Sequence, residues 1–418
     1  MADAYRVRQY EPGDREEVLS LYGRVFDRHD ESWFDWRYVD NPYVDAVPIA
    51  VAVHDANGRE EVVGARPSLV LRFAVGDASP LGIVQVDPMV HPDHRRQGLF
   101  TRLVEHVYDH YAGREPVMSL GFPNTAVKEA LLGVEERLSI DSGVVMPYVP
   151  SYRIQRPGPL AATGTDRRSL RAAGWLATPA ARAYLAVRRL RADVHAAGNA
   201  DQGGDADGGV IVERSEATPV SDLVTLAPRG RANGGGRVRA TRDETFYDWR
   251  FANPRFDYET HVARRHGEPQ AAVVVGRPRH QPRLAHLSEV LPFPGSLRSD
   301  AVGDGGSAAR GDPATTTPTT TPGVAGDTGA LLRALESAFD ANRDAAAVVT
   351  AGGALPDALL DAGGFVPVSR PPLSFVIEPT TFIARPLTEG RVDGWRLGGV
   401  DLSSPDSWGL TMCEREIG

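Results

Sequence analysis

The stretch that decides the fold runs from residue 84 to residue 111 and reads VQVDPMVHPDHRRQGLFTRLVEHVYDHY. Its apolar beginning, together with Ile83, predicts a buried strand over Ile83–Val90. A polar loop follows. From Leu99 to Tyr111 the apolar side chains recur at helical spacing, and Gly113 lies where a helix would end. The stretch therefore predicts a strand, a short loop and an amphipathic helix, in that order.

The start of the predicted helix combines features that suit a bound anion. The first backbone N–H groups of a helix have no partner within it, and the helix dipole adds positive potential at the same end. Gly98 has no Cβ and allows a ligand to approach the main chain, while Arg95 and Arg96 add positive charge. Such an arrangement can hold a pyrophosphate with backbone groups alone.

The segments around this stretch predict a mixed α/β order. Alternation and apolar runs predict strands over residues 5–10, 49–54, 61–75 and 117–122. Helical spacing predicts one helix over residues 13–26 and another that begins at about Thr125. Asn57-Gly58 lies between two of the strands, as in a tight hairpin turn. We therefore expect an α/β fold with a mixed sheet and the anion loop at its centre.

With these elements in place, the loop resembles the signature of the GNAT acetyltransferase superfamily, [QR]-x-x-G-x-[GA] between a strand and a helix. Arg95, Gly98 and the preceding Val90-His91-Pro92 match that signature, whereas Phe100 replaces its small final residue. A bulky residue there resembles the tandem-lobe subset typified by the enhanced-intracellular-survival aminoglycoside acetyltransferases. Members of that subset have a degenerate second GNAT-like lobe.

The resemblance implies acetyl-CoA as the acyl donor and no metal. The CoA pyrophosphate would lie on main-chain amides of the loop and first helical turn, at Arg95, Arg96, Gln97, Gly98, Leu99 and Phe100. The pantetheine arm would pair with the main chain at Met89 and Val90, and Asn124 would also contact the cofactor. Pro88 suits a bulge or splayed edge there, although an ordinary edge-strand proline is an equal alternative.

The catalytic groups are less well defined than the CoA loop. The resemblance makes the Val90 N–H the donor to the thioester oxygen, and Asp87 is the candidate base, directly or through water. A turn aspartate before proline is the competing interpretation of Asp87. The tyrosine that the family uses as general acid is missing from PNTAVKEALLGVEERL, where Leu131 or Lys128 takes its place.

The chain repeats one of its segments. ESWFDWRYVDNP at Glu31–Pro42 recurs as ETFYDWRFANP at Glu244–Pro254, and a strand-like segment with a glycine follows each copy. Two copies of one fold explain this better than chance in a biased composition. The recurring Glu31, Asp35 and Arg37 are therefore expected to be structural residues at helix ends. The second copy has no counterpart of HPDHRRQG, so we expect it to bind no CoA.

These observations predict a duplicated GNAT fold with four regions. They are a CoA-binding lobe over residues 1–150, a helical connector and linker over 151–209, a degenerate second lobe over 210–380, and a C-terminal tail over 381–418. Within the second lobe, DPATTTPTTTPG and its flanks, at about 294–329, predict a disordered insertion. The tail is too short for the third lobe of the survival-type enzymes, so no catalytic carboxylate is expected at Gly418.

The composition of the chain limits the classes of binding partner and the cellular compartment that we expect. The formal net charge of −9 argues against a nucleic-acid partner, and no apolar run approaches the ~20 residues that a membrane span needs. Cys413 is the only cysteine and the N-terminus lacks an apolar core, which together predict a cytoplasmic protein without disulfides. Acidic excess and a single lysine, Lys128, are typical of a GC-rich, salt-adapted organism such as a haloarchaeon, although base bias alone gives the same pattern.

Three functional hypotheses follow. The first is an N-acetyltransferase that moves an acetyl group from acetyl-CoA to a small-molecule amine or to the amino group of a protein. The second is another acyl or aminoacyl transferase, because tandem lobes also serve those reactions; the CoA loop favours the first. The third is a non-catalytic acyl-CoA-binding module, which the missing tyrosine favours. The sequence predicts neither the acceptor nor the oligomeric state.

Overall fold

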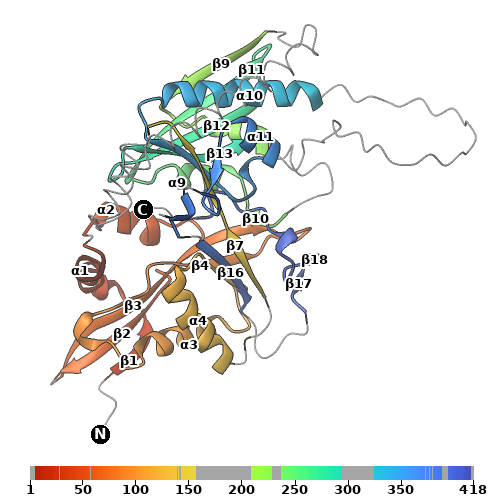
Figure 1. The fold of residues 1–418 in the computed structure, drawn as a ribbon. Helices are drawn as coiled ribbons and strands as arrows, with labels where there is room; N and C mark the ends of the chain where they lie inside the picture. The colour runs from red at the N-terminus through yellow and green to blue at the C-terminus, as the bar shows by residue number, and fades with distance from the viewer. Residues whose placement is uncertain are drawn as a thin grey trace, which may run out of the picture.

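The computed structural model describes most of the chain (Figure 1). The described residues are 5–27, 29–56, 58–138, 140, 143–156, 209–227, 237–293, 324–371, 373–375, 377–378, 380–387 and 394–415. Nearly all of the predicted helical connector, most of the predicted insertion and Gly418 lie outside these residues. So do residues 229–236, whose sequence RGRANGGG also predicts a linker. Among the described residues, no helix combines the length and the apolar character that a membrane crossing needs.

The first sheet contains nine strands. Its main path runs β1 (Tyr5–Gln9), β2 (Ile49–Ala56), β3 (Arg59–Ala74), β4 (Leu81–Gln85), β6 (Met118–Gly121), β16 (Thr380–Pro386) and β7 (Val144–Tyr148). Two short strands, β5 (Met89–Val90) and β10 (Arg239–Ala240), also pair with β3. The β4–β6 pair is parallel, and its neighbours along the path are antiparallel.

The second sheet repeats this order in seven strands. The path runs β9 (Val210–Ser215), β11 (Phe256–Arg265), β12 (Glu268–Pro278), β13 (Leu284–Leu291), β14 (Ala347–Ala351), β8 (Pro150–Ile154) and β15 (Val366–Pro367). Its parallel pair, β13–β14, takes the place of β4–β6 in the first sheet. The predicted duplication of a mixed α/β fold is therefore confirmed. We call each sheet with its helices a lobe.

Helices cover both faces of the first sheet. α1 (Arg15–Phe26) and α2 (Glu31–Phe34) pack against one face, where Leu19 and Trp33 share a core with Leu69. α3 (Leu99–Tyr111) and α4 (Thr125–Arg137) lie on the other face, where Leu103 packs with Val70. Neighbouring residues of β3 point to opposite faces, so this strand supplies side chains to both cores.

Four helices of the second lobe lie among the described residues, and those labelled in Figure 1 lie beside its sheet. They are α8 (Val220–Leu226), α9 (Glu244–Arg250), α10 (Val324–Ala341) and α11 (Asp357–Ala362). A two-stranded sheet of β17 (Arg396–Leu397) and β18 (Val400–Asp401) precedes the last described residues. α10 packs on β12 and β11 as α3 packs on β2 and β3, which extends the correspondence between the lobes.

Each lobe is completed by a strand from the other half of the chain. β16, blue in Figure 1, lies between β6 and β7 of the first sheet and is antiparallel to both. β8 directly follows β7, yet it pairs with β14 and β15 of the second sheet. The sequence predicted a helical connector from residue 151 and a tail from residue 381, whereas residues 151–154 and 381–386 are strands of the second and first sheets. The exchange interlocks the two halves of the chain.

The repeated segments meet where the lobes join. The rings of Trp36 and Trp249 stack with 5.2 Å between their centroids and 12° between their planes. Trp36 Nε1 donates to the carbonyl of Trp249 at 2.7 Å, and Trp249 Nε1 donates to the carbonyl of Trp36 at 2.9 Å. Because each repeat makes the same contact with the other, the lobes are related locally by an approximate twofold axis.

The other repeated residues make equivalent local contacts in both copies. Asp30 accepts a hydrogen bond from the Trp33 N–H and caps α2, as Asp243 caps α9. Asn41 and Asn253 each accept a hydrogen bond at Oδ1 from the backbone N–H two residues later. The repeat is thus a short helix that follows a capping aspartate and ends in an Asn-Pro turn before the next strand.

Candidate functional site

The two parallel strands at the centre of the first lobe separate at one end. β4 and β6 pair as far as Gln85 and Gly121, after which the chain continues from β4 into β5 along β3. On β3, Ser68 pairs with Gln85 and Ala65 pairs with Met89. Three residues, 86–88, therefore face two on β3, which is a β-bulge. The predicted continuous strand Ile83–Val90 is wrong in this detail, and Pro88 lies within the bulge.

Asp87 has an unusual backbone conformation in this bulge. Its φ of +41° lies in the left-handed region, which aspartate tolerates better than most residues. Its carboxylate accepts a hydrogen bond from Arg37 Nη1 at 3.1 Å. The Arg37 side chain is 1% exposed, and its guanidinium lies over the Trp33 ring at 4.6 Å. Arg37 was predicted to be a structural residue, but it holds the candidate base in place.

The backbone of β5 presents one residue to the gap between the strands. The N–H of His91 donates to the carbonyl of Val63 at 2.8 Å, which makes this a hydrogen-bonded pair of the β3–β5 ladder. Hydrogen-bonded and non-hydrogen-bonded pairs alternate in an antiparallel ladder, so the polar groups of Val90 point away from β3. By the same rule those of Met89 point toward β3. The geometry favours Val90 over Met89 as a backbone partner for a ligand.

The loop before α3 is open to solvent along its main chain. Arg95, Arg96, Gln97 and Gly98 are all exposed, and Leu99 is the first buried residue of the helix. Arg96 and Gly98 have φ values of +64° and +73°, and a Cβ at Gly98 would meet nothing within 4 Å. Gly98 is the N-cap of α3 and supplies no side-chain hydrogen bond. The N–H groups of the first turn therefore have no partner from the cap.

A cavity of about 260 Å³ lies at the separated ends of β4 and β6. It is lined by Phe26, Arg37, Arg66, Gln85, Val86, Asp87, Pro88, Gly121, Phe122, Pro123, Asn124, Val127, Leu131 and Arg415. We call it the central pocket. Phe26 and Arg37 come from the α1–α2 side of the sheet, and Asn124 and Leu131 from the α4 side. The pocket therefore reaches from one face of the sheet to the other through the gap.

The structure places two further residues of the sequence analysis in this pocket. Asn124 caps α4 by accepting a hydrogen bond from the Val127 N–H at 2.9 Å. Leu131, one of the two residues proposed to replace the missing tyrosine, lies in the wall, whereas Lys128 is not among the lining residues. No tyrosine or cysteine occurs among the described residues that line the pocket.

Three nearby tyrosines are part of the packed interior. Tyr108 donates a hydrogen bond to Glu135 at 3.0 Å, and burial raises the pKa of its hydroxyl well above the usual value. Tyr148 donates to the carbonyl of Thr411 at 2.9 Å, and Tyr111 belongs to the core beneath α3. Their burial and hydrogen bonds are typical of core aromatics rather than of a general acid.

The second lobe has the same break between its parallel strands, but the chain itself fills it. β13 pairs with β14 only as far as His286 and Val349, after which the strands separate. The Cys413 thiol donates to the Ser288 carbonyl of β13 at 3.0 Å. The N–H of Gly353, just after β14, donates to the Leu410 carbonyl at 2.9 Å. Residues 410–414, which we call the plug, therefore lie between the strand ends.

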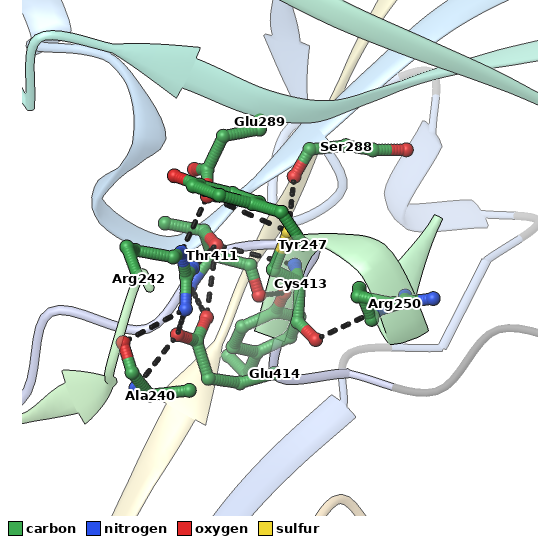
Figure 2. Close-up of polar contacts among 10 residues, drawn as sticks. Ala240, Arg242, Tyr247, Arg250, Ser288, Glu289, Thr411, Cys413 and Glu414 are labelled. Atoms are coloured by element: carbon green, nitrogen blue, oxygen red, sulfur yellow. Dashed lines mark hydrogen bonds and ion pairs between the residues drawn. The ribbon is translucent and has the colours of Figure 1, made fainter. Parts of the chain in front are cut away.

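Figure 2 shows how buried charges hold the plug. The Arg242 guanidinium lies between Glu289 of β13 and Glu414 of the plug, with Nη1 2.8 Å from Glu414 Oε1. Arg250, the counterpart of Arg37, donates to the Cys413 carbonyl at 3.1 Å. Burial raises the pKa of the Cys413 thiol well above the usual value, so the thiol keeps the proton that it donates. The plug is held in the gap by Arg242, Arg250 and Ser288, which are far from it along the chain, so no local pattern predicted it.

Within the part of the chain that the structure describes, no group of three or more His, Cys, Asp or Glu side chains is arranged to hold a metal ion.

A comparison with protein families gives one match, which lies in the first lobe. Residues 6–128 match the model described as an acetyltransferase (GNAT) domain. This part of the chain is therefore similar to GNAT acetyltransferase domains. The match contains the loop before α3. It also contains the bulge at Asp87 and the start of α4, both of which line the central pocket. No curated protein sequence matches the chain significantly.

Solved structures resemble the chain over most of its length. A probable N-acyltransferase of Enterococcus faecalis V583 is 9% identical, with a TM-score of 0.51 over 92% of this chain and 73% of that protein. This likeness shows the fold alone. A tandem GNAT protein from the clavulanic acid biosynthesis pathway is 13% identical, with a TM-score of 0.47 over 93% of this chain and 100% of that protein. Eis1 from Mycobacterium abscessus is 11% identical, with a TM-score of 0.43 over 92% of this chain and 73% of that protein.

Proposed function

We propose that the protein transfers an acetyl group from acetyl-CoA to an amine, with the first lobe binding the donor. One combination of features carries this proposal. An exposed loop with left-handed residues leads into α3, and β4 and β6 separate within the same region that matches the GNAT domain model. The acceptor would be a small-molecule amine or a protein amino group. A cytoplasmic location and a haloarchaeal origin stay predictions from composition.

In this proposal the donor binds mainly through the main chain. The pyrophosphate lies on the N–H groups of the loop from Arg95 to Phe100, where the helix dipole and two arginines favour negative charge. The pantetheine arm enters the gap beside β5 and pairs with Val90. Asn124, Val127 and Leu131 of α4 line the pocket and would pack on the arm from the other side. The thioester then lies in the central pocket.

The reaction would use few side chains. The amine nitrogen attacks the thioester carbonyl carbon, and the Val90 N–H donates to the oxygen as negative charge builds on it. Asp87 accepts the proton of the amine directly or through one water. The C–S bond breaks, and the CoA thiolate takes its proton from solvent. Such a route needs no tyrosine at the position of Leu131.

The second lobe would bind no CoA and would form part of the wall of the acceptor site. The plug occupies its strand gap, and Arg415, directly after the plug, lines the central pocket of the first lobe. The plug thus closes the strand gap of the second lobe and also places Arg415 in the wall of the central pocket of the first lobe.

Replacing Gly98 with valine is expected to abolish binding of CoA and acetyl-CoA. Valine disfavours the left-handed conformation at φ +73°, and its branched side chain would project into the open space where the phosphates would lie. Isothermal titration calorimetry measures the affinity. The matched control is Gly58→Val, which changes a left-handed glycine at φ +82° in a distant hairpin turn that also has open space. Unchanged affinity in Gly98→Val would refute the assignment of the CoA loop.

Asp87→Asn is expected to lower kcat by about 10²-fold or more while CoA affinity is kept. Asparagine tolerates the left-handed backbone and can still accept a hydrogen bond from Arg37, but it cannot take a proton from the amine. Release of free thiol with a panel of amines measures the rate across pH, and Asp55→Asn at the distant hairpin is the control. A full rate in Asp87→Asn would exclude the base role. An unaltered protein that binds acetyl-CoA but releases no thiol would favour a non-catalytic acyl-CoA-binding module.

A further inference from the structure

The central pocket contains a buried arginine that the proposed reaction does not use. Arg66 lies on β3 opposite the bulge at Asp87 and is 4% exposed. Its guanidinium lies 5.6 Å from the centre of the Phe100 ring, in the first turn of α3. Burial lowers the pKa of Arg66 to about 10, so the side chain still carries its charge at neutral pH.

Arg66 has no ion-pair partner in the part of the chain that the structure describes. Its buried Nε makes no hydrogen bond there. The carboxylate of Glu135 interacts electrostatically with Arg66 and raises its pKa, but it already accepts hydrogen bonds from Arg385 at 3.0 Å and from Tyr108 at 3.0 Å. Burial of a charge without a partner is costly, and proteins seldom retain one unless it serves a purpose. A ligand that brings a negative charge would provide the missing partner.

The other charged residues of the pocket also favour a negatively charged ligand. Arg37 is paired with Asp87, the one acidic residue among the lining residues that the structure describes. Arg415 enters from the end of the plug, where its guanidinium lies 5.5 Å from the centre of the Tyr148 ring. Three arginines and one aspartate leave the pocket with an excess of positive charge beside a narrow, largely buried gap.

We propose that the central pocket binds a carboxylate carried by one of the two substrates, with Arg66 as its buried anchor and Arg415 as a second cation. The inference rests on the proposed function, since it assumes that donor and acceptor meet in this gap. A planar guanidinium suits a carboxylate because it donates two parallel hydrogen bonds. The carboxylate belongs either to a dicarboxylic acyl group on CoA or to an acceptor with the form of an amino acid.

The test compares pairs of compounds that differ only in the carboxylate. Succinyl-CoA and propionyl-CoA test the donor, and glycine and glycinamide, titrated in the presence of CoA, test the acceptor. Calorimetry on the full chain should show a preference of roughly 10- to 100-fold for the carboxylate member of one pair. The pair that shows the preference identifies the substrate that carries the group.

The preference should disappear in Arg66→Met and remain partly in Arg66→Lys, whereas affinity for CoA itself should not change. Methionine fills a similar volume without charge, so the variant should be at least as resistant to thermal unfolding as the unaltered protein. Arg59→Met, at the exposed start of the same strand, is the control and should keep the preference. A loss of thermal stability in Arg66→Met with the preference kept would make Arg66 a structural residue and overturn the proposal.

The remaining outcomes separate this inference from the proposed function. If CoA binds but neither pair shows a preference, the carboxylate pocket is wrong and the transferase proposal stands. If CoA does not bind, the transferase proposal fails. The carboxylate pocket is then tested separately with free succinate. Thermal stabilisation by succinate but not by succinamide, lost in Arg66→Met, would support a carboxylate pocket; equal effects of the two probes would overturn it.

Discussion

A chain that ends at residue 379 is expected to lose the folded first lobe, although it still contains all of residues 6–128, which match the acetyltransferase domain model, and the loop before α3. The truncation removes β16 from between β6 and β7 and exposes the hydrogen-bonding edges of both strands. Phe382 and Ile383 are buried, and each contributes about 1.5–3 kcal/mol to stability. Loss of Arg385 also leaves Glu135 buried without its ion-pair partner, at a cost of about 3–5 kcal/mol.

These losses, together with that of the plug, are comparable to the whole stability of a typical domain, about 5–15 kcal/mol. We therefore expect low soluble yield, no cooperative thermal transition by circular dichroism and no CoA binding. A chain that ends at Arg415 is the control and should melt like the unaltered protein. Supplying residues 380–418 as a separate chain should restore part of the folded signal. Cooperative melting of the 379-residue chain at the normal temperature would contradict the role of β16.

The local elements of the first lobe could be predicted because their signals are short in range. The apolar spacing of Leu99–Tyr111 predicted α3 with the bounds that the structure gives. The hairpin around Gly58, the strand near 117–122 and the helix from Thr125 are also confirmed to within a few residues. In each case the pattern depends on neighbours within one or two helical turns or along one strand.

The exchange of β8 and β16 could not be predicted in the same way. Both segments look like ordinary strands, and nothing in their own residues specifies a partner that lies far away along the chain, such as Ala347 for Ile154 or Gly121 for Ile383. The plug could not be predicted for the same reason. The roles of Thr411 and Glu414 depend on their contacts with Arg242 and Tyr148, which are distant along the chain. Pairing across such distances depends on the complete core rather than on a local pattern.

The central pocket was predicted in part. Asp87, Val90 and Asn124 follow from the resemblance and lie around the gap, but Arg37 was assigned to structure and Arg66 was overlooked. A signal for Arg66 was present in the sequence, because a charged residue interrupts the apolar strand between Ala65 and Leu69. A buried strand seldom holds an arginine without a purpose, so such an interruption indicates a candidate site.

Trp36→Ala is expected to destabilise the whole protein by about 3–5 kcal/mol, and Trp249→Ala by a similar amount. Both indoles are buried, with exposed fractions of 6% and 7%, and each donates a hydrogen bond to the backbone of the other. Either substitution opens a cavity between the lobes, removes the ring stacking and leaves a carbonyl without its donor. Urea unfolding followed by circular dichroism measures the loss.

The double variant shows whether the two repeats act as one contact. Either single substitution already removes the stacking partner of the other ring. The loss of stability in the double variant should therefore be smaller than the sum of the two single losses by about 1 kcal/mol or more. Trp36→Phe keeps an aromatic ring but removes one hydrogen bond, and it should cost less than Trp36→Ala. Pairing Trp36→Ala with Trp395→Ala, whose ring contacts Trp408 instead, should give additive losses. If Trp36→Ala and Trp249→Ala also prove additive, the stacked pair does not couple the lobes. Coupling would mean instead that the duplicated segment was kept in both copies because each copy stabilises the other.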